Sequence, residues 1–440
     1  RGVLPELGER AVATSTLEAL LSKVLGGAPV EGRAERFERL SLAQPADRGR
    51  MKDEIALKSS AAFVRRLNRF ARELPRRHIE FQDVCYGGQM IATRQLLRAR
   101  LLAGDGPVGT RLRRIELALW RDIGQLRPAR RRRLVEYAAR RPEHALETEA
   151  CGRAYSILEC AALARHIRRF ARLNVRALYG RLMADEGLNA PPPGKLPLED
   201  AAAIACLRLL VEEGGSLPRI RQVVVDEAQD LDEVQFAVLN RLFPRARFTV
   251  LGDFNQSLDR PADRSMYDRI AAILGRRSAA LVELNKSFRC TLEILRFALR
   301  FVGAPGGVEC FNRSGDAPIE RAGADLGALC TAIADEVALC RARGMQSIAL
   351  IARTAKSAAA WRGRLTDLGL GLADGEAGVP SGAFLVPLAL AKGLEFDAVL
   401  VLDAQQYAGD GRLLYVACTR ALHRLSLYTL LEGGDAAWRS

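Results

Sequence analysis

The sequence predicts an α/β protein with parallel sheets and a mostly helical insertion, and three observations lead to this prediction. Residues 223–225 are three valines, a continuous β-branched run that is typical of a parallel strand buried on both faces. The run ends at Asp226 and Glu227, at the strand edge where open α/β sheets bind their ligands. Residues 45–185 show no strand signature and repeat apolar side chains at helical spacing.

The strands predicted along the chain fall into two groups, one on each side of position 289. The first group is expected at 221–225, 247–251 and 279–284, and the second at 347–352, 382–386, 397–402 and 424–429. We therefore predict a partial first α/β domain over 1–44, a helical, arginine-rich insertion and linker over 45–199, the rest of the first domain over 200–288, and a second α/β domain over 289–440. The linker contains the prolines at 191–193, which cannot continue a helix.

The composition excludes several classes of protein. The chain has 440 residues, 27% of them charged, and is long enough for two or three domains with separate cores. It has no run of about 18 apolar residues that would span a membrane, and no signal peptide is recognised. Its 9 cysteines include no C-x-x-C pair, so we expect reduced thiols and a cytoplasmic protein instead of a zinc site or a disulfide framework.

Five segments resemble, in order and spacing, motifs II to VI of UvrD/Rep-type superfamily 1 helicases. They are residues 221–232, which contain Val-Asp-Glu-Ala-Gln-Asp, 249–257, 284–290, 391–399, which begin Ala-Lys-Gly-Leu-Glu-Phe-Asp, and 412–425. The wording at 385–399 and 415–423, together with that at 3–9, resembles the HelD (helicase IV-like) branch, whose members act on RNA polymerase. The resemblance implies two RecA-like domains, the first incomplete in this chain, that open and close around ATP and Mg²⁺.

The resemblance gives expected roles to three residues in the first two of these segments. Asp226 is expected to bind Mg²⁺ through water. Glu227 is expected to be the general base that deprotonates the attacking water in ATP hydrolysis. Gln256 is expected to sense the γ-phosphate and to link its state to the nucleic-acid track. The residues alone allow another explanation of the two acids, in which they serve the dipole of a following helix.

The segments after position 284 are expected to supply the other side of the ATP site. Phe288 fills the position whose ring stacks on adenine in the family, where tyrosine is usual. Arg289 and Arg420 match the two arginines that reach the γ-phosphate, because a planar and permanently charged fork suits charge spread over oxygens. Glu395, which follows Gly393, matches the residue that contacts the nucleotide sugar.

The excess of basic residues is concentrated in the predicted insertion. The net charge is +14, from 66 Lys and Arg against 52 Asp and Glu, and such a balance favours a polyanionic partner. The candidate contacts to nucleic acid or to a polymerase are Arg130, Arg131, Arg132, Arg133, Arg165, Arg169, Arg172 and Arg176. Those from 165 onward recur at helical spacing and are expected to line one face. A solvated helix face explains the same residues, and both explanations stay open.

Some features of the family are missing. A G-x-x-x-x-G-K-[ST] phosphate loop does not occur in the 440 residues. The nearest string, from Gly187 to Leu196, contains three prolines and is interpreted as a linker. Leu258 and Ala389 stand where the family has single-strand-contacting residues, an aromatic and a histidine. We expect the chain to be the C-terminal part of a longer protein and to be inactive toward ATP by itself.

Three functions are compatible with these observations. The first is a DNA helicase or translocase, with the 3′-to-5′ polarity usual in the family, that acts on single-stranded DNA or duplex junctions. The second is a HelD-type factor that uses ATP to remodel or recycle RNA polymerase. The third is a remnant that binds nucleic acid or protein without ATP. The sequence upstream of Arg1 would separate the third function from the others, and the oligomeric state is unknown.

Overall fold

The structure of the protein is a computed structural model whose residues group into two compact units. The described residues are 13–141, 143, 147–213, 215–257, 264–275, 279–284, 286–303, 309–310, 313–368, 370, 372–373 and 382–431. The first unit comprises Arg1–Glu31, Ile55–Val223 and Glu233–Arg247, and the second comprises Gly32–Glu54, Val224–Asp232 and Phe248–Ser440. The segment 3–9 that resembles the HelD branch lies outside the described residues. The domain boundaries predicted from the sequence stay a prediction.

Most of the first unit is helical. Its helices are α1 (Leu17–Val24), α4 (Ala61–Arg77), α5 (Arg94–Ala103), α6 (Val108–Ala139), α7 (Thr148–Ala171), α8 (Val175–Asp185), α9 (Leu198–Val211) and α10 (Glu233–Leu242), and α3 (Pro45–Ser59) contains residues of both units. From Leu198 to Leu207 every residue of α9 is buried, so this helix is central to the core of the unit. Helix α4 packs against α9. It buries Phe63, Leu67 and Phe70, whose spacing of four and three residues places them on one face.

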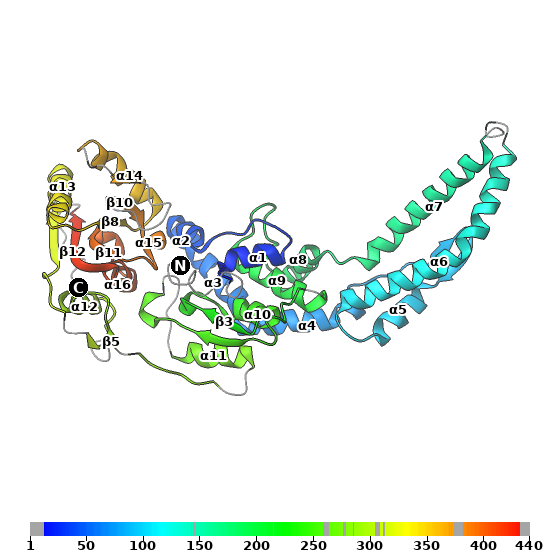
Figure 1. Cartoon of the computed structure of the whole chain (residues 1–440), viewed down its shortest axis with the longest axis horizontal. Coiled ribbons are helices and arrows are strands. Elements are labelled where there is room, and N and C mark those ends of the chain that lie inside the picture. The colour runs from blue at the N-terminus through cyan, green and yellow to red at the C-terminus, as the bar shows by residue number, and fades with distance from the viewer. Residues whose placement is uncertain are drawn as a thin grey trace. The chain divides into compact units, whose positions relative to one another are not determined.

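Helices α6 and α7 form a long antiparallel hairpin (Figure 1). They contain 32 and 24 residues. The two backbones approach so closely at Gly152 that a Cβ there would lie 2.5 Å from Cγ2 of Val135. Buried side chains such as Leu134 in α6 and Leu163 in α7 fill the hairpin. The mostly helical insertion predicted from the apolar spacing is therefore confirmed. No helix in the described part of the chain is long and apolar enough to cross a lipid bilayer.

A short β-hairpin within the insertion corrects the prediction that residues 45–185 contain no strand. Strands β1 (Val84–Tyr86) and β2 (Gln89–Ala92) pair in antiparallel fashion. Gly87 and Gly88 connect them with φ angles of 58° and 83°. Two consecutive residues at positive φ make the tight turn that matches the twist of a hairpin, and glycine adopts it without strain. The Gly-Gly pair between apolar residues was the available sequence signal for this hairpin.

The second unit is built on a six-stranded sheet. The strands are β7 (Ile319–Gly323), β8 (Ser347–Ala352), β9 (Leu372–Ala373), β10 (Gly382–Pro387), β11 (Phe396–Val401) and β12 (Ala421–Leu430). Their order is β7-β12-β11-β8-β10-β9, and every neighbouring pair is parallel. The four strands predicted after position 289 are confirmed as β8, β10, β11 and β12. The strands β7 and β9 were not predicted.

Helices cover both faces of this sheet. The helices of the unit are α2 (Arg33–Leu42), α11 (Ser265–Leu274), α12 (Leu292–Leu299), α13 (Leu326–Ala342), α14 (Ala355–Thr366), α15 (Leu388–Ala391) and α16 (Gly411–Cys418). Along β11, Val399 and Val401 join a core that includes residues of α12 and α16. Ala398 and Leu400 join a second core that includes residues of α13 and α14. Burial on both faces is typical of parallel sheets, and the predicted α/β class is confirmed.

Strands β3 (Gln222–Val225) and β4 (Arg247–Val250) confirm two of the strands predicted before position 289. The N–H of Arg247 donates to the carbonyl oxygen of Arg221, and the N–H of Leu251 donates to that of Val225. The partners advance together along the chain, so the pair is parallel. A third pair, also parallel, joins β5 (Lys286–Ser287) and β6 (Glu309–Cys310).

Two predictions about this region are wrong. The three valines are not continuously buried, since Val224 is 61% exposed while Val225 is 8% exposed. The strand predicted at 279–284 is an irregular segment, with Val282 75% and Leu284 87% exposed. A strand requires a neighbour for its backbone N–H and carbonyl groups as well as an apolar sequence. The apolar pattern at 279–284 was therefore insufficient to specify a strand.

Candidate functional site

The two acids singled out in the sequence lie at the C-terminal end of β3, as predicted. Asp226 is exposed, and its Oδ1 accepts a hydrogen bond of 2.9 Å from the N–H of Glu227. Glu227 has a φ of 52°, and the short helix η3 (Ala228–Asp230) follows it. A residue other than glycine in this left-handed region costs about 1–3 kcal/mol, and such residues cluster at functional sites. The side chain of Glu227 is 33% exposed, so it is accessible to water.

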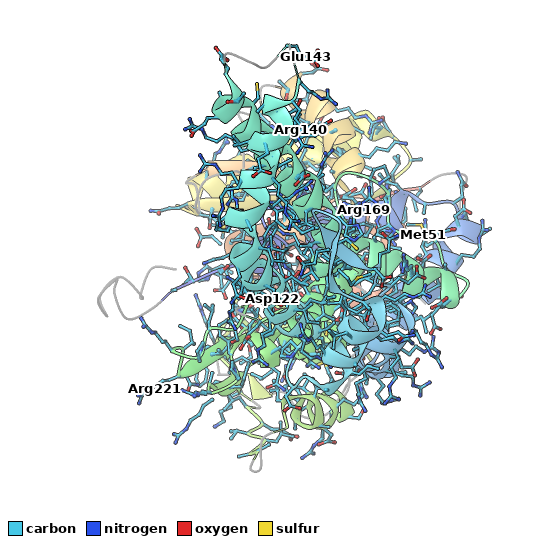
Figure 2. The ribbon with its side chains drawn as sticks, turned by 90° about the vertical axis from the view of Figure 1, so that its right-hand side faces the viewer. Met51, Asp122, Arg140, Glu143, Arg169 and Arg221 are labelled. Carbon is cyan, nitrogen blue, oxygen red and sulfur yellow. The ribbon has the colours of Figure 1, made fainter. Side chains whose placement is uncertain are left out.

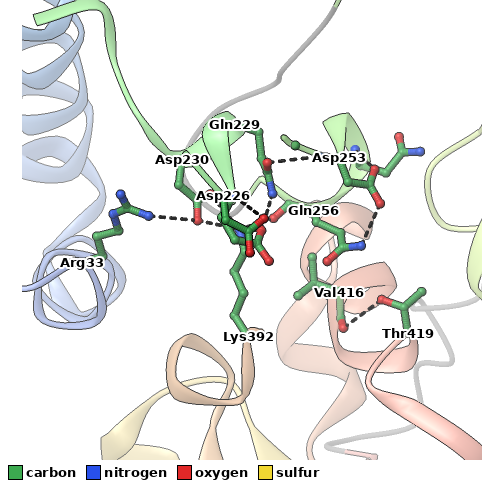
Figure 3. A network of polar contacts seen from close by, with 12 residues as sticks. Arg33, Asp226, Gln229, Asp230, Asp253, Gln256, Lys392, Val416 and Thr419 are labelled. Carbon is green, nitrogen blue, oxygen red and sulfur yellow. Dashed lines mark hydrogen bonds and ion pairs between the residues drawn. The ribbon is translucent and has the colours of Figure 1, made fainter. Parts of the chain in front are cut away.

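A continuous chain of hydrogen bonds connects Glu227 with Arg420. Figure 3 shows its middle residues Gln229, Asp253 and Gln256. Gln229 Nε2 donates to Glu227 Oε2 at 2.6 Å, and Gln229 Oε1 accepts from the N–H of Asp253 at 3.1 Å. Gln256 Nε2 donates to Asp253 Oδ2 at 2.7 Å, and Arg420 Nη2 donates to Gln256 Oε1 at 2.6 Å. The structure thus links three of the predicted site residues, Glu227, Gln256 and Arg420, through two residues that were not predicted.

Arg420 is held deep in the protein, since it is 1% exposed. Its Nε donates to the carbonyl oxygen of Val416 at 3.1 Å. Burial and the nearby guanidinium of Arg289 lower the pKa of Arg420 to about 10, although the carboxylates of Glu227 and Glu395 oppose this shift. Arg420 therefore keeps its positive charge at neutral pH. A guanidinium group that is buried and always charged suits an anionic ligand better than a guanidinium group in water does.

The other site residues predicted after position 284 are more exposed than Arg420. Arg289 forms an ion pair of 2.5 Å with Glu395, and these two side chains are 38% and 44% exposed. Phe288 is 65% exposed. Gly393 has a φ of 79°. This backbone conformation favours glycine, which explains why a glycine precedes the segment that carries Glu395.

Lys392 is a member of the site that the sequence analysis did not identify. Its Nζ donates to both carboxylate oxygens of Asp230 at 2.7 Å and to the carbonyl oxygen of Gln256. The same Nζ lies 3.8 Å from Glu227 Oε2, and the lysine side chain is 7% exposed. A further ion pair of 3.6 Å joins Asp230 to Arg33. Lys392 lies in the segment 391–399 and Asp230 in the segment 221–232. Nothing in either segment indicates that these two residues pair.

The arginines predicted to contact nucleic acid or a polymerase are only partly arranged as expected. Arg131, Arg132, Arg133, Arg165, Arg169, Arg172 and Arg176 are exposed. Arg130 is paired with Glu159 through two hydrogen bonds, and this partner raises the pKa of Arg130. Figure 2 shows Arg140 near the far end of the α6–α7 hairpin and Arg169 closer to its base.

The single helix face predicted for 165–176 is wrong beyond Ala171, because Arg172 is the C-cap of α7 and Arg176 belongs to the next helix. Helix α7 ends at Ala171, and Arg176 belongs to α8, where its Nη2 donates to the carbonyl oxygen of Pro192 at 2.6 Å. Asn174 caps α8, since its side chain accepts from the N–H of Ala177. The break between the helices explains the difference, because a new helix axis changes which residues share a face.

The glycine- and proline-rich string that ends at Leu196, predicted to be a linker, lies between helices α8 and α9. Leu196 is 2% exposed, and its N–H donates to the carbonyl oxygen of Pro29 at 2.9 Å. Val30 and Leu196 form a parallel β-bridge. The segment after Gln256 in which Leu258 replaces an aromatic residue lies outside the described residues. Ala389 lies in α15.

Two segments match models of known protein families. Residues 216–260 match the UvrD/REP helicase N-terminal domain, and residues 382–428 match the UvrD-like helicase C-terminal domain. The first segment contains Asp226, Glu227 and Gln256, and the second contains Glu395 and Arg420. No curated protein matches the chain.

Three of the solved structures that match parts of the chain are helicases or parts of helicases by name. The C-terminal domain of a possible DNA helicase from Lactobacillus plantarum WCFS1 is 30% identical, and the match covers 33% of this chain and 88% of that one with a TM-score of 0.28. The helicase of PRRSV is 13% identical over 58% of this chain and 45% of that one, with a TM-score of 0.30. An arterivirus nonstructural protein 10 helicase in complex with DNA is 15% identical over 57% and 46%, with a TM-score of 0.28.

Proposed function

Because two segments of this chain are those of UvrD/Rep-type superfamily 1 helicases, we propose that it supplies most of the ATP site of a DNA helicase or translocase. The hydrogen-bond chain from Glu227 through Gln256 to Arg420 carries the proposal. This hydrogen-bond chain joins residues of the first matched segment to Arg420 of the second. A change at Glu227 can therefore be transmitted to Arg420, and the reverse. A motor requires such coupling between the site of hydrolysis and the part that moves.

The residues at the end of β3 fit Mg²⁺ and ATP chemically. Mg²⁺ is usually held by one or two carboxylates together with phosphate oxygens and water. The exposed Asp226 can supply such a carboxylate, and no group of three or more His, Cys, Asp and Glu in the described part of the chain could hold a metal by itself. The fit therefore depends on a nucleotide that brings its own oxygens.

Six of the predicted residues have the following chemical tasks in this proposal. ATP with Mg²⁺ supplies the phosphoanhydride whose hydrolysis drives the motor. Glu227 accepts the proton of the attacking water. Arg289 and Arg420 stabilise the charge that develops on the phosphoryl oxygens. Phe288 stacks on the base, and Gly393 allows the turn that brings Glu395 toward the sugar.

The 440-residue chain alone should bind ATP weakly and hydrolyse it at a negligible rate. In the proposed function a phosphate loop outside these residues completes the site, and phosphoryl transfer depends on positioning and on charge stabilisation by all parts together. Phosphate release with and without Mg²⁺ measures this, and the full-length protein is the positive control. Magnesium-dependent turnover by the 440-residue chain would show that the phosphate loop is dispensable.

A second candidate function, the remodelling of RNA polymerase, is supported by the HelD-like wording and by the α6–α7 hairpin. The 32 residues of α6 give a helix about 48 Å long at 1.5 Å per residue, which is long enough to reach into a partner. Helices α6 and α7 carry exposed arginines but also exposed Ile157 and Leu158. Co-purification with RNA polymerase favours this candidate, and strand displacement on a forked DNA duplex favours a helicase.

Replacing Arg131, Arg132, Arg165 and Arg169 with glutamine should flatten the salt dependence of DNA binding. Each phosphate contact contributes about −0.7 to the slope of log K against log salt for single strands and about −0.9 for duplex DNA. Four lost contacts therefore change the slope by roughly 3 units. Binding isotherms at several salt concentrations measure the slope, and ATP hydrolysis by the full-length protein should barely change.

The matched control removes the same number of charges from another helix. Arg65, Arg69, Arg72 and Arg76 of α4 are exposed as well, and their replacement with glutamine should leave the slope unchanged. If the slope is unchanged in the α6–α7 variant, the replaced arginines face solvent or contact a protein partner and do not contact DNA. Loss of polymerase co-purification in that variant would then support the second candidate.

A further inference from the structure

Gln229 is completely buried, and both ends of its side-chain amide are used. The backbone N–H of Asp253 can only donate, so the atom that faces it must be the amide oxygen Oε1. The amide nitrogen Nε2 therefore faces Glu227 Oε2, at 2.6 Å. Rotation of the amide would break both hydrogen bonds, so the direction of the donor is fixed.

The chain makes room for this side chain at Gly252. A Cβ at Gly252 would lie 2.7 Å from Oε1 of Gln229 and 3.2 Å from its backbone nitrogen. Contacts this short force a neighbour to move, and the neighbours here are the amide that binds Glu227 and the hydroxyl of Tyr267, which would lie 2.8 Å from the same Cβ. Any larger residue at 252 would therefore crowd Gln229.

The same arrangement occurs a second time, at the end of β11. Asp403 has a φ of 51°, and the short helix η5 (Ala404–Tyr407) follows it. Gln405, two residues after this acid, donates from Nε2 to Asp403 Oδ1 at 3.4 Å and accepts at Oε1 from the N–H of Leu430 in the neighbouring strand β12 at 3.2 Å. Both copies thus consist of an acid with a left-handed backbone, a glutamine two residues later, and a backbone N–H from the adjacent strand or from the loop that follows that strand.

The two copies differ in the environment of the acid. Asp403 is 8% exposed and accepts a hydrogen bond of 2.7 Å from Nε1 of Trp361, so its carboxylate is part of the core. The side chain of Glu227 is 33% exposed. The second copy therefore stabilises the fold, while the first holds an acid that water can reach.

We propose that Gln229 is a positioning residue for the Glu227 carboxylate, a proposal that rests on the function proposed above. Gln229 binds Oε2 and leaves Oε1 to accept the proton of the attacking water. A carboxylate on a partly exposed side chain samples several rotamers, and only some of them point at the water. Fixing one oxygen reduces these rotamers before the reaction begins.

The test compares three variants of the full-length protein in steady-state ATP hydrolysis. Gln229→Met has neither the donor nor the acceptor. Gln229→Glu keeps an acceptor for the N–H of Asp253 but has no donor for Glu227. Both should lower kcat by at least about 10-fold, with the KM for ATP within about twofold of the wild-type value, because a misplaced base slows the chemical step and not the binding. The matched control Gln405→Met should keep the wild-type kcat.

The outcomes separate the positioning role from a structural role. If Gln229→Glu hydrolyses ATP at the wild-type rate, the contact with Glu227 has no positioning role and the inference is overturned, even if Gln229→Met is impaired. Equal losses of kcat in Gln229→Met and Gln405→Met, with equally lowered melting temperatures, would also overturn it. If the wild-type protein hydrolyses no ATP, the proposed function itself fails and the inference fails with it.

Discussion

Glu227→Gln in the full-length protein should lower the rate of ATP hydrolysis by at least about 10²-fold, the contribution expected of a general base, while ATP still binds. The amide keeps the shape of the side chain but cannot accept the proton of the water. Its oxygen can still accept the hydrogen bond from Gln229 Nε2. The amide NH₂ group then lies where Oε1 of the Glu227 carboxylate would accept the proton. Glutamine has the same side-chain shape as glutamate, so the left-handed backbone at position 227 should be retained.

Single-turnover hydrolysis and equilibrium binding of ATP separate the two effects. The exposed Glu283, which pairs with Arg264 at 3.0 Å, provides a control, because Glu283→Gln removes the same charge outside the site. This control should hydrolyse ATP at the wild-type rate. If Glu227→Gln also keeps the wild-type rate, Glu227 is not the base. If it loses binding as strongly as hydrolysis, the carboxylate serves to hold the nucleotide.

Asp200→Ala should lower the free energy of unfolding of the 440-residue chain by about 3–5 kcal/mol, the cost of leaving a buried charge without its partner. Asp200 Oδ1 lies 2.6 Å from Lys58 Nζ, and both side chains are nearly inaccessible, at 4% and 2% exposed. The same oxygen accepts a hydrogen bond of 2.7 Å from the hydroxyl of Tyr179. The pair joins α3 to the central helix α9, so its loss should weaken the core of the first unit.

Urea unfolding followed by circular dichroism measures this change. Glu212→Ala is the matched control, because Glu212 pairs with Arg208 of the same helix at 2.8 Å but the two side chains are 34% and 37% exposed. An accessible pair of this kind contributes no more than about 1 kcal/mol. Replacing both buried charges, with Lys58→Met and Asp200→Leu, should recover most of the loss. A cost for Asp200→Ala that equals the cost for Glu212→Ala would show that the buried pair contributes little.

The sequence by itself determined those features whose cause lies within a few residues. The valines before Asp226 specify a strand, and the abrupt change to acids places Asp226 and Glu227 at its end. Apolar spacing along the insertion specified helices, because a period of 3.6 residues produces one apolar face. The hairpin at 84–92 also had a local signal in its two glycines, which was overlooked.

Only the tertiary structure decided which distant residues meet. Gln229 and Asp253, or Lys58 and Asp200, are separated by 24 and 142 residues, and their hydrogen bonds follow from how whole elements pack. The segment at 279–284 has the apolar residues of a strand but does not form one, because a strand also needs backbone partners from elsewhere in the chain. The sequence thus predicted Glu227 as a site residue, whereas packing placed the side chain of Gln229 against its carboxylate. Hydrogen bonds form at about 3 Å between donor and acceptor, so they depend on where packing places two residues and not on how many residues separate them along the chain.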